Sequence, residues 1–87
     1  MKYYNHFRKQ AQITYRVAVR VYGYSTRFDD VLSGSKYINA YLQGTINGLI
    51  VAEVTSVEEV RACQRYAKIV EKAYDRNYIG KHLSSNK

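Results

Sequence analysis

The strongest structural signal in this sequence is a long amphipathic segment that begins at Ser56. Ser56 and Glu59 have the spacing of a capping box, in which the serine accepts from the Glu59 amide and the glutamate reaches back. Apolar residues then recur at helical spacing to about Tyr78, and Gly80 with Lys81 is a usual C-terminal stop. The predicted apolar stripe is Val60, Cys63, Ala67, Val70 and Tyr74. The sequence therefore predicts a helix from residue 56 to about residue 78.

Residues 12–25 alternate between apolar and other side chains with a period of two, which is typical of a β-strand. The same segment also permits a helix, because apolar residues recur there at spacings of four and three. That alternative helix face is Ile13, Val17, Val21, Tyr24 and Phe28. The strand is favoured because β-branched residues crowd the segment and lower its helix propensity.

Residues 37–55 predict a β-hairpin. Asn47-Gly48 is the dipeptide that a type I′ turn prefers, and the segments 37–46 and 49–55 on either side alternate in polarity. A helix over residues 37–43, ended by Gly44, is the alternative. Residues 26–35 are expected to be a connection, and the first ten residues are expected to be either a short helix or an irregular arm.

These elements predict an α+β fold, in which a three-stranded antiparallel sheet packs on one long C-terminal helix. An all-α three-helix domain is the alternative. The 87 residues allow a single domain, expected over residues 1–80, with residues 81–87 as a flexible basic tail. Residues 37–52 carry no charge but include Asn, Gln and Gly, so no membrane span is expected. The single cysteine, Cys63, favours a reduced cytoplasmic protein.

Positive charge is concentrated toward the two ends of the chain. The net charge is +7; residues 1–27 contain six bases and no acid, and residues 61–87 contain seven bases and two acids. A basic field attracts polyanions, so nucleic acid is the expected partner, although basic residues also keep small domains soluble.

The exposed face of the predicted sheet is the first candidate binding site. Arginine binds phosphates or guanine edges, asparagine pairs with adenine, and tyrosine stacks on bases. The alternatives are an ordinary solvated sheet face or a protein interface. The face comprises Thr14, Arg16, Arg20, Tyr22, Lys36, Tyr37, Asn39 and Tyr41.

The C-terminal helix carries a second candidate site, a basic stripe at helical spacing. It consists of Arg61, Arg65, Lys68, Lys72 and Arg76. Such a stripe suits a helix laid along a phosphate backbone. The alternative is a solvated face with ion pairs from Lys68 to Glu71 and from Lys72 to Asp75.

No catalytic constellation is expected. His6 and His82 lie near opposite ends of the chain without carboxylates at ligand spacing, and Cys63 lies on the apolar helix face. The segment from Gly44 to Gly48 lacks the lysine of a phosphate-binding loop. The sequence therefore predicts a protein that is not an enzyme and needs no metal or cofactor.

Two segments resemble the AP2-like, integrase arm-type DNA-binding module. They are Tyr15-Arg16-Val17-Ala18-Val19-Arg20 and Val54-Thr55-Ser56-Val57-Glu58-Glu59-Val60, within a similar span of about residues 13–72. The resemblance implies three strands followed by a helix, with the sheet face in the DNA major groove. It would make Arg16, Arg20, Tyr37, Asn39 and Tyr41 the reading residues.

The functional prediction is a small basic protein that binds nucleic acid, DNA rather than RNA, with Arg16 and Arg20 as the central contacts. The alternative is a protein-binding inhibitor or adaptor of the mobile-element type. Such a protein would dock on an acidic protein surface or on a host complex that binds nucleic acid. A homodimer through exposed strand edges is a further expectation.

Overall fold

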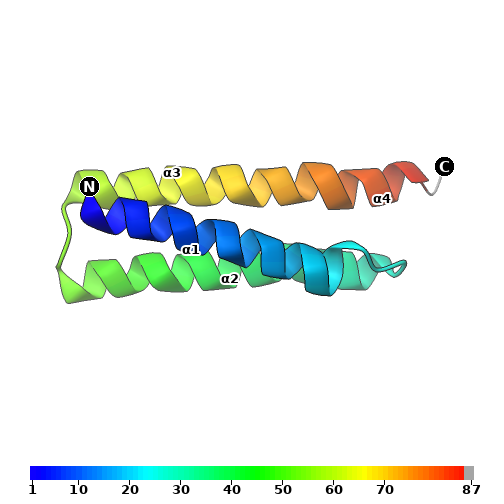
Figure 1. The fold of residues 1–87 in the computed structure, drawn as a ribbon, viewed down its shortest axis with the longest axis horizontal. Coiled ribbons are helices and arrows are strands. Elements are labelled where there is room, and N and C mark those ends of the chain that lie inside the picture. Colours follow the sequence, from blue (N-terminus) through cyan, green and yellow to red (C-terminus); the bar gives the residue numbers. More distant parts are fainter. Residues whose placement is uncertain (86–87) are drawn as a thin grey trace.

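The computed structural model describes residues 1–85 and shows an all-helical bundle with three long helices side by side (Figure 1). It measures 47 × 17 × 16 Å. The elements are α1 (Lys2–Ala18), continued by the π-helical η1 (Val19–Gly23); α2 (Phe28–Ala52); and α3 (Val57–Tyr74), continued by the π-helical η2 (Asp75–Ile79) and α4 (Gly80–Ser85). Successive long helices run in opposite directions, with the N-terminus beside the start of α3 (Figure 1).

The predicted α+β fold is therefore wrong, and the architecture is the three-helix alternative. Residues 1–85 contain no strand, so the sheet that the AP2-like resemblance implies is not formed. The strand edges on which the expected homodimer depended are likewise missing from this part of the chain. Each long helix instead contributes one stripe to a shared core.

The predicted strand at residues 12–25 is the end of α1 followed by η1. The buried face of α1 is Phe7, Ala11, Thr14 and Ala18. Ile13, Val17 and Val21 are 48%, 37% and 60% exposed, so the alternative helix face was also the wrong face. From Ala11 to Ala18 the core positions of α1 hold small side chains, which let helices approach closely, whereas Phe7 is a large core residue. The exposed β-branched residues cost a helix at most about 0.7 kcal/mol each.

The predicted hairpin at residues 37–55 is also wrong, because α2 runs through Asn47-Gly48 to Ala52. The chain reverses only afterwards, at Glu53, which adopts the left-handed conformation with φ 54°. Glycine costs a helix about 1 kcal/mol. Burial of Ile38, Leu42 and Ile46 offsets that cost, at about 1.5–3 kcal/mol for each fully buried side chain.

The start of α3 confirms half of the predicted capping box. Ser56 Oγ accepts a hydrogen bond from the Glu59 amide at 3.1 Å. The Glu59 carboxylate accepts from Thr55 Oγ1 and, at 2.9 Å, from the Tyr4 amide at the start of α1. These hydrogen bonds, Thr55 first, lower the pKa of Glu59. Glu59 thus caps α1, where Met1 supplies no side-chain cap.

The predicted apolar stripe of this helix is confirmed. Cys63, Ala67, Val70 and Tyr74 are buried in the core, and Val60 is half-buried against it. Burial raises the pKa of the Cys63 thiol. The helix does not stop at the predicted C-terminus, since η2 and α4 continue it through Gly80, whose backbone is right-handed helical.

Side-chain hydrogen bonds join α3 and η2 to α2 along what we term the α2–α3 seam. The buried Tyr74 hydroxyl donates to the Val31 carbonyl at 2.7 Å. Ser35 Oγ donates to Asp75 at 2.8 Å, and Asn39 Nδ2 donates to Glu71 at 2.9 Å. Both acids beside the basic stripe of α3 therefore bond to α2.

Two further expectations concern the end of the chain and the membrane. Part of the predicted tail, residues 81–85, lies in α4, and residues 86–87 lie outside the described residues. Among residues 1–85, no helix has the length and apolar character needed to cross a membrane.

Candidate functional site

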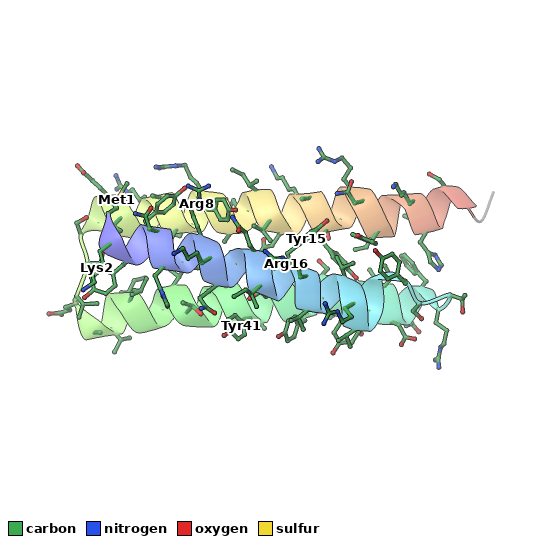
Figure 2. The ribbon with its side chains drawn as sticks, in the orientation of Figure 1. Met1, Lys2, Arg8, Tyr15, Arg16 and Tyr41 are labelled. Atoms are coloured by element: carbon green, nitrogen blue, oxygen red, sulfur yellow. The ribbon has the colours of Figure 1, made fainter. Side chains whose placement is uncertain are left out.

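Four hollows follow one another along the side of the bundle where α1 packs beside α3 and η2. Each shares lining residues with the next: Gln12 joins the first to the second, Tyr15 and Arg16 join the second to the third, and Tyr24 and Tyr78 join the third to the fourth. Their volumes, in the same order, are about 370, 400, 290 and 590 Å³. We term this row of adjoining hollows the α1–α3 groove; its first hollow is lined by α1 residues alone. Figure 2 shows Arg8 and Tyr15 on the side of α1 that faces α3.

The side chains that line the α1–α3 groove are uniformly basic or uncharged. No Asp or Glu of the described residues lines any of the four hollows. A concave surface lined by one sign of charge focuses the field and concentrates counter-ions of the opposite sign. The bases are Arg8, Lys9, Arg16, Arg20 and Lys81.

Tyrosine rings line the same groove and contact one another. The Tyr15 and Tyr78 ring centroids are 6.3 Å apart, and those of Tyr24 and Tyr78 are 5.8 Å apart in an edge-to-face arrangement. Burial first, and hydrogen bonding to Tyr24 second, raise the pKa of Tyr78 to about 12. Tyr24, in contrast, is 75% exposed at the junction of the third and fourth hollows.

The two π-helical segments meet at this end of the groove. Residues of η1 and η2 line both the third and the fourth hollow. π-Helical turns make up well under 1% of residues in proteins and frequently mark functional sites. Gly23 permits the close approach here, since a Cβ at this position would lie 3.1 Å from the Tyr78 ring.

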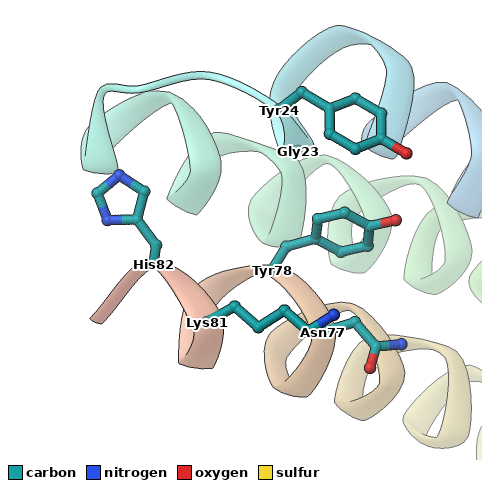
Figure 3. Close-up of a pocket in the computed structure, with 6 residues that line it drawn as sticks. All are labelled: Gly23, Tyr24, Asn77, Tyr78, Lys81 and His82. Carbon is teal, nitrogen blue, oxygen red and sulfur yellow. The ribbon is translucent and has the colours of Figure 1, made fainter. Parts of the chain in front are cut away.

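The fourth hollow, shown in Figure 3, is the last of the row and lies beside α4. Its lining combines the Tyr24 and Tyr78 rings with polar side chains from η2 and α4, Asn77, Lys81 and His82. His82 Nε2 lies 3.0 Å from the Thr26 carbonyl and its ring lies beside Phe28. These contacts hold α4 against the connection between η1 and α2.

At the opposite end, Arg8 crosses from α1 to α3. Its guanidinium lies 5.4 Å from the Tyr66 ring centroid and 5.9 Å from the Tyr4 ring centroid. Both distances are within cation–π range. Gln12 Nε2 donates to the Tyr66 hydroxyl at 3.3 Å. Arg8 is still exposed, so its charge remains available at the surface of the groove.

The structure separates the residues that the predicted sheet face grouped together. Arg16 and Arg20 lie in the α1–α3 groove, whereas Asn39 bonds to Glu71 and Lys36 is exposed on α2. The buried Thr14 bonds to a carbonyl of its own helix. Tyr22, Tyr37 and Tyr41 form a separate row of rings, 6.2 and 6.1 Å apart.

The predicted basic stripe does lie on an exposed helix face. Arg61, Arg65, Lys68, Lys72 and Arg76 are all exposed, on the side of α3 and η2 turned away from the core. The stripe is distinct from the α1–α3 groove, whose lining contains none of these five residues.

Sequence reasoning missed most of the groove because it divided residues 1–25 between an arm and a strand. On one continuous helix, Arg8, Gln12 and Arg16 recur every four residues and share a face, which is a signal that the sequence contains. The contributions of Tyr24 and Lys81 depend on how the helices pack, for which the sequence carries no local signal.

Residues 1–85 contain no group of three or more His, Cys, Asp or Glu side chains that could hold a metal ion. No protein-family model matches the chain, and neither the curated proteins nor the solved structures yield a match. Function is therefore inferred from the geometry of this chain alone.

Proposed function

We propose that this protein binds nucleic acid, and that the phosphates of the ligand lie in the α1–α3 groove. The observation that carries this proposal is the lining of the four joined hollows, which holds five bases and no Asp or Glu. Phosphate neutralisation by Lys and Arg supplies most of the sequence-independent affinity for nucleic acid. Arg16 and Arg20 remain the central contacts, now on a helix rather than on a strand.

The dimensions of the groove suit a chain of phosphates. Along α1 and η1 it extends from Asn5 to Gly23, which is about 27 Å at 1.5 Å per residue. Arginine and lysine recur along this length, and Lys9, Arg16 and Arg20 are all exposed. A polyanion can therefore contact several cations at once, whereas a single small anion cannot. The buried cysteine, Cys63, fits a reduced cytoplasmic setting for this activity.

The test is a fluorescence anisotropy titration with labelled oligonucleotides at about 50 and 200 mM salt. The variant K9A/R16A/R20A removes three groove charges from exposed positions that no core contact involves. We expect the slope of log affinity against log salt to fall in magnitude by about 2–3, because each of the three lost phosphate contacts contributes about 0.7–0.9.

The matched control is R61A/K68A/K72A, which removes three exposed charges from the stripe on α3. The control should leave the slope close to that of the unmodified protein. An equal loss in both variants would show that net charge, not the groove, attracts the ligand. Absence of binding at the lower salt would contradict the proposal and favour the other candidate, an inhibitor or adaptor whose basic groove docks on an acidic protein surface.

A further inference from the structure

We propose that the α1–α3 groove takes a single nucleic-acid strand rather than a duplex, and that one nucleobase of this strand stacks on Tyr24. This inference rests on the proposed function and names the class of ligand. Both duplex and single strand present phosphates, so a basic lining does not by itself select the single strand. The size of the groove and the exposure of its Tyr24 ring favour the single strand.

The groove is too small to enclose a duplex. It is a depression in one side of a bundle only 17 × 16 Å in cross-section, and its hollows have volumes of about 290–590 Å³. Such volumes lie in the range of pockets for single small molecules, roughly 300–1,000 Å³. A duplex is wider than its own major groove, which is already about 12 Å across, so on a bundle of this cross-section it would rest on the rims of the α1–α3 groove.

An exposed tyrosine ring can stack on the face of an unpaired base, which a single strand presents and a duplex does not. In a single strand the base faces are accessible, and aromatic side chains bind them without regard to sequence. Tyr24 is 75% exposed, and its ring lies edge-on to Tyr78 at 5.8 Å (Figure 3). The contact with Tyr78 orients the Tyr24 ring, and the high exposure of Tyr24 leaves ring surface for a base.

Cations line the same two hollows as the Tyr24 ring. Arg16, Arg20 and Tyr24 line the same hollow, and Lys81 and Asn77 line the next one. A base on Tyr24 therefore places its flanking phosphates toward Arg20 on one side and toward α4 on the other. Along about 27 Å of groove, a strand with a rise of about 3.4 Å would span roughly 8 nucleotides.

The experiment compares three polyanions by anisotropy and competition at low salt, with every concentration counted per phosphate. They are an oligothymidylate of roughly 12 nucleotides, a duplex of similar length, and inorganic polyphosphate, which has the charge but no bases. The variants are Tyr24→Leu and, as the matched control, Tyr41→Leu, which removes an exposed tyrosine from α2 on another side of the bundle (Figure 2). Circular dichroism checks that both remain helical.

We expect the single strand to bind at least about tenfold more tightly than the duplex. Tyr24→Leu should weaken single-strand binding by roughly 5- to 150-fold, the range for loss of one stacked base, and leave polyphosphate binding unchanged. Tyr41→Leu should change neither. Tyr24→Trp should retain single-strand binding, and because the chain has no other tryptophan, its emission should be quenched by the oligothymidylate and not by polyphosphate.

The opposite outcomes separate the two proposals. Equal or tighter binding of the duplex, or a Tyr24→Leu variant that binds oligothymidylate normally, would overturn the single-strand inference while the groove remained a nucleic-acid site. Failure of all three polyanions to bind the unmodified protein would instead overturn the proposed function, and the inference with it.

Discussion

Helix α3 and its continuation η2 pack against α2 on one side and against α1 on the other, and the two contacts are built differently. The α2–α3 seam is closed by side-chain hydrogen bonds from Tyr74, Asp75 and Glu71. The contact with α1 has longer side-chain hydrogen bonds along its middle, Gln12 to Tyr66 at 3.3 Å and Asn77 to Tyr15 at 3.4 Å. It also leaves a row of hollows bordered by cations. One seam is therefore structural, while the other leaves space for a ligand.

The chain has seven acidic residues, yet none of those in the described part lines the groove, and the two seams show why. Glu71 and Asp75 accept from Asn39 and Ser35 of α2, so these two carboxylates bond on the side of α3 opposite to the α1–α3 groove. Glu59 lies at the end of the bundle, where it caps α1. These three acids thus stabilise the fold from positions outside the lining of the groove.

The largest expected effect on the α2–α3 seam is that of Gly34→Ala. A Cβ at this position would lie 2.0 Å from the Tyr74 hydroxyl oxygen and 2.4 Å from the adjacent ring carbon, so the buried ring must move and lose its bond to Val31. We expect a loss of about 3 kcal/mol in the free energy of unfolding, from overpacking and a lost hydrogen bond. Urea denaturation followed by circular dichroism measures it.

Gly44 provides the control on the same helix. Nothing lies within 4 Å of a Cβ built there, so Gly44→Ala should stabilise the protein by up to about 1 kcal/mol through helix propensity. Equal effects at the two glycines would show that the Tyr74 ring does not close the seam.

The second prediction concerns alkaline pH. Burial, and then the charge of Asp75, raise the pKa of Tyr74 to about 12 in the folded protein, above the ordinary value of 10. Since the unfolded chain loses this proton more readily, the contribution of Tyr74 to stability is complete below pH 10 and is lost as the pH rises from 10 to 12. Urea midpoints measured across this window should fall.

Tyr74→Phe is the control for this pH dependence. The variant should show a smaller fall between pH 10 and 12, with the remainder due to Tyr78, whose pKa is also about 12. A fall as steep as that of the unmodified protein would place the alkaline transition elsewhere in the molecule.

The third prediction is the effect of the same substitution at neutral pH. Tyr74→Phe removes the hydroxyl that donates to Val31 across the seam but keeps the ring in the core. We expect a loss of about 1 kcal/mol in the free energy of unfolding, the usual net value of one hydrogen bond. A neutral effect would mean that ring packing alone closes the seam.

The two seams also differ in how far the sequence predicts them. The start and the buried stripe of α3 are predictable because Ser56, Glu59 and the apolar residues act locally. After Phe7, the buried positions of α1 hold the small residues Ala11, Thr14 and Ala18, while the larger β-branched Ile13 and Val17 are exposed. A pattern that assigns the larger apolar residues to the core therefore selects the wrong face.

The groove is harder to predict because it belongs to no single segment. Of the residues predicted to bind a ligand, Arg16 and Arg20 line it, and they meet Tyr78 only because α1 packs beside η2. The Asn47-Gly48 signal, which is strong for isolated hairpins, is overridden by the burial of Leu42 and Ile46 in the same helix. Packing between helices, not local preference, decides both outcomes.

The smallest effect on stability is expected in the α1–α3 groove itself, for Arg8→Gln. This substitution removes an exposed charge that lies over the Tyr66 and Tyr4 rings, a contribution of about 0.5 kcal/mol at an exposed site. The urea midpoint should fall less than it does for Tyr74→Phe. The slope of log affinity for an oligonucleotide against log salt should fall in magnitude by about 0.7–0.9.

This pair of measurements tests the contrast between the seams directly. If Arg8→Gln destabilised the protein more than Tyr74→Phe and left the salt slope unchanged, Arg8 would be a structural clamp between α1 and α3, and the groove would be a second closed seam. If the free energy of unfolding hardly changes while the salt slope falls in magnitude, Arg8 contributes to ligand binding and not to the stability of the fold. The hydrogen bonds of the α2–α3 seam then suffice to hold α3 in place while the opposite side stays open.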